Sequence, residues 1–248
     1  LDFTPQADDA GRTEADWIDA VLGATRTAVQ RRLVADAPVG ALLSGGVDSS
    51  LIVGLMAEQG ANLKTYSIGF EDVGEEKGNE FEYSDCVAQH FATDHHQIRI
   101  DSGNLLGRLP EAIRAMSEPM VSHDCVAFYL LSEAVSQHSK VVQSGQGADE
   151  VFGGYHWYPP MLTSRDGPAD YARGFCDRSH ADYLALVQAT HQSADDVSRA
   201  FIAQHFASAG ATRPVDQALR LDTTIMLVDD PVKRVDTMPM AFGLEARV

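Results

Sequence analysis

The chain has 248 residues, 44% of them hydrophobic and 22% charged, so it is long and apolar enough to bury a sizeable core. Its 36 acidic residues against 19 Lys and Arg give a formal charge of −17, which disfavours a duplex nucleic acid partner and favours a soluble, freely diffusing protein. The sequence has no run of about eighteen apolar residues, so it predicts no membrane span. The acidic N-terminal stretch is unlike a secretory signal.

Helices and strands are predicted to alternate through the first 144 residues. Thr13 and Asp16 form a capping box, from which a helix is predicted to run toward Val34 before Pro38 ends it. The predicted strands are 39–43, 63–70, 95–100 and 140–144, and the predicted helices among them are 49–60, 82–91, 104–116 and 126–137. This alternation implies right-handed crossovers and an α/β fold, with a parallel twisted sheet covered by helices on both faces. From about residue 166 to 222 the pattern is helix-rich.

The stretch LLSGGVDSS, residues 42–50, joins the first predicted strand to the next helix. It lacks the lysine of a Walker loop, the glycine spacing of a dinucleotide fingerprint and the glycine two residues before Ser44 that a nucleophile elbow requires. Its glycines permit a ligand to approach the backbone, and a helix start offers free N–H groups to phosphate. Asp48 would repel bare phosphate, so it indicates a Mg²⁺ ion that bridges to pyrophosphate oxygens. The alternative is a turn capped by Asp or Ser that binds no ligand.

A second glycine-containing stretch, SGQGADEVFGGY at residues 144–155, also follows a predicted strand. SGGVDSS resembles the pyrophosphate loop of the ATP pyrophosphatase superfamily, and the second stretch resembles the asparagine synthetase signature S-G-E/D-G-A/S-D-E. Residues 80–100 and 232–248 agree with the same family in the same order, so the chain is identified as a member of it. The resemblance implies an adenine nucleotide α-hydrolase-like fold of the PP-loop type. It implies an ATP-binding core at residues 1–160 and a helical, incomplete part of the same synthetase domain at residues 161–248.

Two strands that end near Leu43 and Ser144 in one parallel sheet would bring both loops to the same carboxyl edge, where α/β sheets bind ligands. The resemblance implies that ATP and pyrophosphate contact Leu43, Ser44, Gly45, Gly46, Asp48, Ser49, Ser50, Ser67, Ile68, Gly69, Ser144, Gly145 and Gly147. The implied catalytic residues are Asp48, Gln146, Asp149 and Glu150, with Asp48 and Asp149 sharing one Mg²⁺. The implied acceptor side comprises Glu118, Ser122, His123, Asp124, Asp236, Glu245 and Arg247. A solvated loop or a helix N-cap is the alternative for Asp149 and Glu150. Surface ion pairing is the alternative for Asp236, Glu245 and Arg247.

The implied reaction is a two-step amide synthesis that consumes ATP. An acceptor carboxylate attacks the α-phosphorus and releases pyrophosphate, and ammonia derived from glutamine then displaces AMP from the acyl-adenylate. The site has to exclude water, which would hydrolyse this intermediate. Gln146 stands where asparagine synthetases usually carry Glu or Asp, and it cannot act as a base. Together with residues 118–125 it resembles the branch that amidates N-acetylglutaminylglutamine, and aspartate is the alternative acceptor.

Members of the family begin with a glutaminase domain and continue beyond LEARV to a catalytic lysine, so we expect this sequence to be truncated at both ends. Ammonia would then come from a glutaminase domain that the sequence lacks, and homodimer formation is left open. A non-catalytic ATP-binding module is the alternative of another class. Residues 71–80 are a candidate lid. Three widely spaced cysteines, Cys86, Cys125 and Cys176, form no CxxC pattern and predict reduced thiols in a cytoplasmic protein.

Overall fold

The computed structural model describes residues 3–4, 6, 9, 11–60, 62–71, 78–101, 103, 105–120, 122 and 124–248. The chain forms two compact units, each built from segments that are separate in sequence. The sheet unit comprises residues 12–146 and 229–248, and the helical unit comprises residues 1–11 and 147–228. The sequence analysis divided the chain into an ATP-binding core at residues 1–160 and a helical part at residues 161–248. This division by function stays a prediction.

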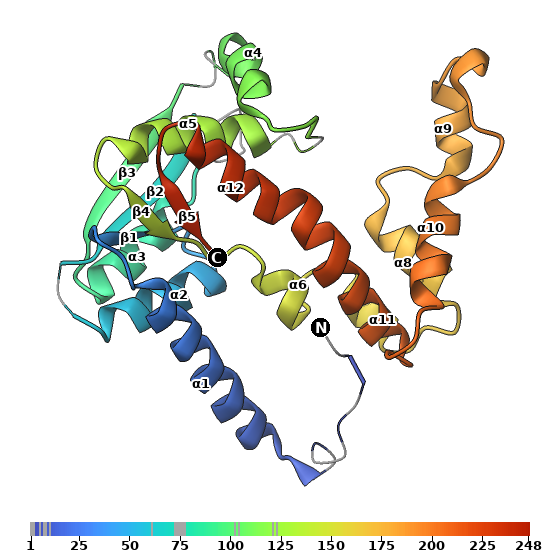
Figure 1. Ribbon diagram of the computed structural model, residues 1–248, viewed down its shortest axis with the longest axis horizontal. Coiled ribbons are helices and arrows are strands. Elements are labelled where there is room, and N and C mark those ends of the chain that lie inside the picture. Colours follow the sequence, from blue (N-terminus) through green and yellow to red (C-terminus); the bar gives the residue numbers. More distant parts are fainter. Residues whose placement is uncertain are drawn as a thin grey trace. The chain divides into compact units, whose positions relative to one another are not determined.

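The sheet unit contains a five-stranded sheet in the order β3-β2-β1-β4-β5, in which all neighbouring strands are parallel (Figure 1). Its strands are β1 (Val39–Leu42), β2 (Lys64–Phe70), β3 (Asp94–Ile100), β4 (Val141–Gln143) and β5 (Glu245–Arg247). Its helices are α1 (Glu14–Arg32), α2 (Val47–Ala57), α3 (Phe81–His90), α4 (Leu105–Ala115), α5 (Asp124–Ser136) and α12 (Lys233–Met240). The capping box of Thr13 and Asp16 starts α1 as predicted.

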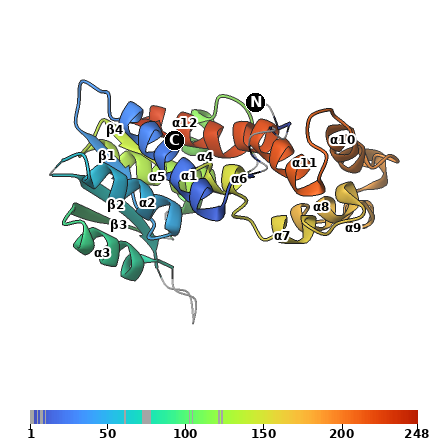
Figure 2. The same ribbon diagram turned by 90° about the horizontal axis from the view of Figure 1, so that it is seen from below.

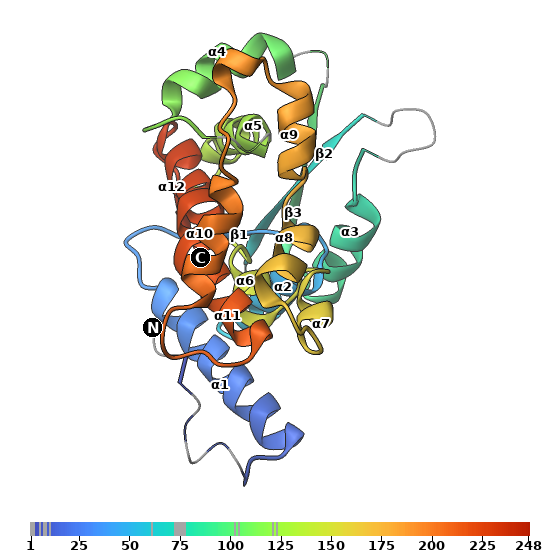
Figure 3. The same cartoon turned by 90° about the vertical axis from the view of Figure 1, so that its right-hand side faces the viewer.

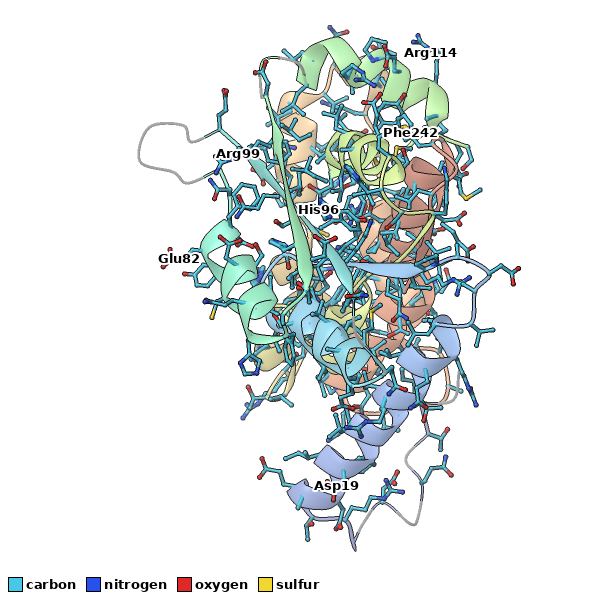
Figure 4. All side chains as sticks on the ribbon, turned by 90° about the vertical axis from the view of Figure 1, so that its left-hand side faces the viewer. Asp19, Glu82, His96, Arg99, Arg114 and Phe242 are labelled. Carbon is cyan, nitrogen blue, oxygen red and sulfur yellow. The ribbon has the colours of Figure 1, made fainter. Side chains whose placement is uncertain are left out.

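Two apolar clusters cover the two faces of this sheet. One joins β1 to α1, α2 and α3 through buried residues that include Val29, Ala41 and Val53. The other joins the opposite face to α5 through Tyr66, Leu131, Val135, Val142 and Leu244, with Ile68 partly buried against it. On β3, His96 stacks on Tyr66 with ring centroids 5.3 Å apart (Figure 4). Helix α12 packs on α5 and β5, and α4 packs on α5 (Figure 3). The predicted parallel sheet with helices on both faces is therefore confirmed.

The helical unit contains the helix-rich segment that the sequence predicts, and four of its helices pack around one apolar cluster (Figure 2). Its elements are α6 (Ala148–Phe152), α7 (Tyr158–Met161), α8 (Gly167–Phe175), α9 (His180–Leu186), the 3₁₀ turn η3 (Ala189–His191), α10 (Val197–Phe206), α11 (Pro214–Leu221) and the π-helical turn η4 (Asp222–Met226). A second π-helical turn, η5 (Val228–Val232), precedes α12. Among the described helices of both units, none is long and apolar enough to cross a membrane.

Asp222 anchors the core of the helical unit through polar contacts. Its side chain is fully buried and accepts hydrogen bonds from Trp157 Nε1 at 3.0 Å, from the Tyr158 hydroxyl at 2.6 Å and from the Tyr171 hydroxyl. Burial raises the pKa of the Asp222 carboxyl, and the three donors oppose this shift. The aromatic residues that follow the second glycine loop therefore pack in the core rather than lining a pocket.

Candidate functional site

The first glycine loop joins β1 to α2 at the carboxyl edge of the sheet. Ser49 is buried, and its hydroxyl lies 3.0 Å from the Ser44 hydroxyl and donates to the Gly46 carbonyl at 3.2 Å. Gly45 has a φ of +91°, and a Cβ atom there would lie 2.5 Å from the Cβ of Tyr83. Only glycine fits this position. The serine hydroxyls and the glycine therefore hold the loop in one conformation.

Helix α2 begins without a side-chain cap. Gly46 is its N-cap residue and supplies no side-chain hydrogen bond to the first turn, so no Asp or Ser caps this helix, and whether the turn binds a ligand stays a prediction. The Ser50 hydroxyl instead donates to the Gly46 carbonyl at 2.7 Å. The N–H groups of a first turn point outward along the positive end of the helix dipole and can bind an anion. Asp48, half-buried, lies in this same turn.

The second glycine loop follows β4, the neighbour of β1 in the sheet. The chain leaves β1 toward β2 on one side, whereas β4 and β5 lie on the other, so the strand order reverses between β1 and β4. A Cβ atom at Gly145 would lie 2.9 Å from the amide nitrogen of Ser49 and 3.1 Å from the carbonyl carbon of Asp48. The two loops thus meet at the start of α2, at the kind of switch point where α/β sheets bind ligands. Gln146 is half-buried, and its backbone N–H donates to the Ser144 hydroxyl at 3.3 Å.

Three of the residues predicted to contact ATP, Leu43, Ser67 and Gly69, make contacts within the sheet unit. The amide of Leu43 donates to a carbonyl of β2 at 2.8 Å, and the buried Ser67 hydroxyl lies 3.1 Å from His95 Nε2. A Cβ atom at Gly69 would lie 2.5 Å from the ring of Phe81, so packing alone accounts for this glycine. A role for these residues in binding ATP stays a prediction.

The rest of the second loop belongs to the helical unit. Gly147, with a φ of +94°, is the N-cap residue of α6, and Asp149 lies in the first turn of this helix. The Asp149 carboxylate packs so closely over Gly154 that a Cβ atom there would lie 1.9 Å from Oδ1. No three His, Cys, Asp or Glu side chains come together as a metal site among the residues that the structure describes. Asp48 and Asp149 are in different units, and their sharing of one Mg²⁺ stays a prediction.

Glu150 is buried in the helical unit, with 1% of its surface exposed. Its Oε1 accepts a hydrogen bond from the Tyr155 hydroxyl at 2.7 Å, whereas its Oε2 has no hydrogen-bond partner among the described residues. Burial raises the pKa of the Glu150 carboxyl. The alternative of a solvated loop residue is therefore wrong for Glu150, and its carboxyl can hold a proton more readily than an ordinary glutamate.

Two neighbouring cations of α12 bind the predicted acceptor segment. Lys233 Nζ lies 2.5 Å from Glu118 Oε1. Arg234, with 5% of its surface exposed, donates from Nη1 to the Ser122 hydroxyl at 2.7 Å and lies 3.4 Å from Asp124 Oδ2. The sequence reasoning missed both cations, because their partners lie more than a hundred positions away in the chain. His123 and most of the candidate lid, residues 72–77, lie outside the described residues.

The C-terminal acceptor candidates have structural contacts of their own. Asp236 is exposed on α12. Arg247 pairs with Glu245 at 2.7 Å and donates from Nη1 to the carbonyls of Arg32 at 2.6 Å and Val34 at 2.9 Å. Arg247 therefore ties β5 to the end of α1, and a role toward an acceptor stays a prediction.

Several known proteins are similar in sequence to this chain. A putative glutamine-hydrolysing asparagine synthetase of Mycobacterium tuberculosis is 33% identical over 168 residues, which cover 68% of this chain and 24% of that protein. The glutamine-hydrolysing asparagine synthetase 3 of Bacillus subtilis is 27% identical over 255 residues, covering 94% of this chain and 40% of that protein. Amidase chyE of Penicillium rubens is 31% identical over 180 residues, which cover 66% of this chain and 26% of that protein. This chain thus spans between a quarter and two fifths of the length of these relatives. Because the asparagine synthase family model matches residues 20–248, the chain belongs to the asparagine synthase family.

Proposed function

We propose that this chain is the ATP-using part of an amidotransferase that joins ammonia to the carboxyl group of a small acceptor. The observation that supports this most directly is the meeting of the two glycine loops at the start of α2, where Gly145 closes on the backbone of Asp48 and Ser49. A helix start with no side-chain cap, at a reversal of strand order, offers N–H donors to a triphosphate.

The residues of these loops would divide the work between binding and orientation. The amides of the first turn of α2 would bind the departing pyrophosphate, and the absence of a side chain at Gly145 would let its oxygens approach the backbone. Mg²⁺ is commonly held by one or two carboxylates together with substrate phosphates, and Asp48 and Asp149 are groups of this type. When bound there, the ion would neutralise the negative charge that develops on pyrophosphate.

The reaction proposed for this site proceeds in two balanced steps. One oxygen of the acceptor carboxylate bonds to the α-phosphorus while the bond to the β-phosphate oxygen breaks, giving an acyl-adenylate and pyrophosphate. Ammonia then bonds to the activated carbonyl carbon, loses a proton, and AMP leaves with the electron pair of the broken bond. The relatives named above as glutamine-hydrolysing synthetases support glutamine as the source of ammonia.

We further propose that the acceptor is N-acetylglutaminylglutamine rather than aspartate. Aspartate carries an ammonium group, which a carboxylate side chain at position 146 could neutralise. Gln146 is a neutral amide and offers no such charge. An N-acetylated dipeptide has no ammonium group, so its binding does not require a carboxylate at position 146. Hydrogen bonding from Gln146 to an amide acceptor is therefore the better chemical match.

The decisive assay records pyrophosphate release from ATP and Mg²⁺ with ammonium as the nitrogen source. Three reactions run in parallel: with N-acetylglutaminylglutamine, with aspartate and without acceptor. Release that depends on the dipeptide supports the proposal, and release that depends on aspartate would replace the proposed acceptor. Binding of ATP without release in any reaction would contradict the proposed activity and favour a non-catalytic ATP-binding module.

Substitution of Gln146 tests the specificity argument separately. Gln146→Glu restores the carboxylate and is expected to raise the turnover of aspartate relative to the dipeptide by about tenfold, which corresponds to about 1.4 kcal/mol of differential binding. Gln137→Glu adds the same charge at an exposed position of the sheet unit and should leave the ratio unchanged. If both variants show the same ratio of aspartate turnover to dipeptide turnover, Gln146 does not determine which acceptor is used.

A further inference from the structure

The helical unit contains a pocket that none of the predicted ATP or acceptor residues line. It is bounded by α8, the start of α9 and the start of α10, and its volume is about 750 Å³. Figure 2 shows these helices gathered within the helical unit. Pockets of roughly 300–1,000 Å³ are of the size that proteins use for small molecules.

Cations are concentrated in the lining of this pocket. Arg173, Arg178 and Arg199 all line it, although the whole chain has 19 Lys and Arg against 36 acidic residues. Arg173 pairs with Asp170 at 2.7 Å. Among the described residues no close ion pair or hydrogen bond joins the Arg178 or Arg199 guanidinium to another group, although the charge of Arg178 helps to lower the pKa of the nearby Asp182 carboxyl. Two planar groups, each able to bind a carboxylate or phosphate through paired N–H donors, are thus available there.

The acidic groups around the pocket are mostly occupied by backbone donors. Asp196 lines the pocket and caps α10, because its Oδ1 accepts from the Arg199 amide at 3.0 Å. Asp182, on α9, accepts from the Ser179 amide at 3.0 Å. Asp195 is the other acidic residue of the lining and is exposed. The lining itself holds three arginines and two aspartates, and Asp170, outside the lining, neutralises Arg173.

A buried histidine nitrogen adds a polar group that lacks a partner. His180 lines the pocket, and its ring stacks on Tyr183 with centroids 5.5 Å apart. Its Nε2 is buried and makes no hydrogen bond with the described residues. Buried polar atoms in native proteins are nearly always paired, so an unpaired one in a cavity wall indicates an absent hydrogen-bonding group.

We propose that this pocket binds a small anion with carboxylate or phosphate groups. Arg178 and Arg199 bind the anionic oxygens, and His180 donates from Nε2 to a further oxygen. The volume exceeds that of a single phosphate, which favours an organic polyanion with several such groups. This site is separate from the proposed reaction at the glycine loops and does not depend on it.

Cys176 provides a local readout because its thiol lines the same pocket. Burial raises the pKa of this thiol, so alkylation is followed at alkaline pH. Cys86 is exposed in the sheet unit and serves as an internal reference. Peptide mass spectrometry measures both alkylation rates with citrate or inorganic phosphate as probe, against sodium chloride at equal ionic strength.

Both probes are expected to slow the alkylation of Cys176 and leave that of Cys86 unchanged. The probe that protects Cys176 at the lower concentration shows whether the pocket prefers carboxylate or phosphate. Arg178→Gln or Arg199→Gln is expected to raise the half-protecting concentration about tenfold, the effect of losing one hydrogen bond to a charged group. Arg165→Gln changes an exposed arginine of the same unit outside the lining and should have no effect. Protection that matches sodium chloride, or that survives both arginine substitutions, would overturn the proposal.

Discussion

Replacing Asp222 by leucine is expected to destabilise the helical unit far more than replacing it by asparagine. The carboxylate of Asp222 is fully buried and accepts from one indole and two tyrosine hydroxyls. Leucine has the same branching at Cγ but is larger and has no acceptor, so all three donors would lose their partner. Asparagine keeps one carbonyl oxygen in place of Oδ2, which retains the bonds from Trp157 and Tyr158.

The expected magnitude follows from the number of donors left unpaired. Each buried donor without an acceptor costs about 1–3 kcal/mol. Leucine also removes a carboxyl group whose raised pKa shows that its burial is costly, which offsets part of the loss. We therefore expect a loss of about 3 kcal/mol for Asp222→Leu, from the lower end of the range, and about 1 kcal/mol for Asp222→Asn.

Urea denaturation followed by Trp157 fluorescence measures this difference. The chain has two tryptophans, so Trp17→Phe makes Trp157 the sole reporter, and it lies in the helical unit. With a slope of about 1–3 kcal/mol per molar urea, the two variants should differ in midpoint by about 1 M. Equal midpoints, or a leucine variant more stable than the asparagine variant, would refute the reasoning. They would show that relief of the buried charge outweighs the three hydrogen bonds.

Two further substitutions test other contacts. Because burial raises the folded-state pKa of Glu150, its contribution to stability is present below the ordinary glutamate pKa and is lost as pH rises through the raised value. The wild-type advantage over Glu150→Gln in urea midpoint should therefore fall with rising pH across this window, and a constant difference would contradict the assignment. Gly45→Ala places a side chain at a φ of +91° against Tyr83 and should lower the stability of the sheet unit by about 2 kcal/mol or more, as followed by thermal denaturation. Gly23→Ala, in an open part of α1, should instead stabilise it by about 0.5–1 kcal/mol, and similar effects of both substitutions would argue against strain at Gly45.

The strands that carry the glycine loops were predictable because their apolar runs are bounded by clear turn signals. The segment VGALL became β1, and KVVQS became β4, each within a residue of its predicted limits. Strand β5 was not predicted, because Glu245–Arg247 is three residues long and has no apolar run. Its pairing with β4 comes from tertiary neighbours that a local pattern does not encode.

The buried charges of the two units were also beyond local patterns. Asp222 and Arg234 lie on helices, where a charged residue is ordinarily exposed. Each is buried because polar partners from remote segments reach it, Tyr158 and Tyr171 in one case and Ser122 in the other. Glu150 was expected at the site from its motif, yet its burial against Tyr155 had no signal in the sequence.

The pairing of β4 with β5 has a consequence for how the protein is made. Gln143 ends β4, whereas its partner strand begins at Glu245, after the entire segment that forms most of the helical unit. At about 5–20 residues per second, a ribosome needs roughly 5–20 s to make the intervening hundred or so residues. During this interval one edge of β4 has no strand to pair with, and unpaired edges invite association with other chains. The nascent protein thus carries an unpaired strand edge until β5 has been made, and a chaperone that covers this edge during synthesis should raise the yield of folded protein.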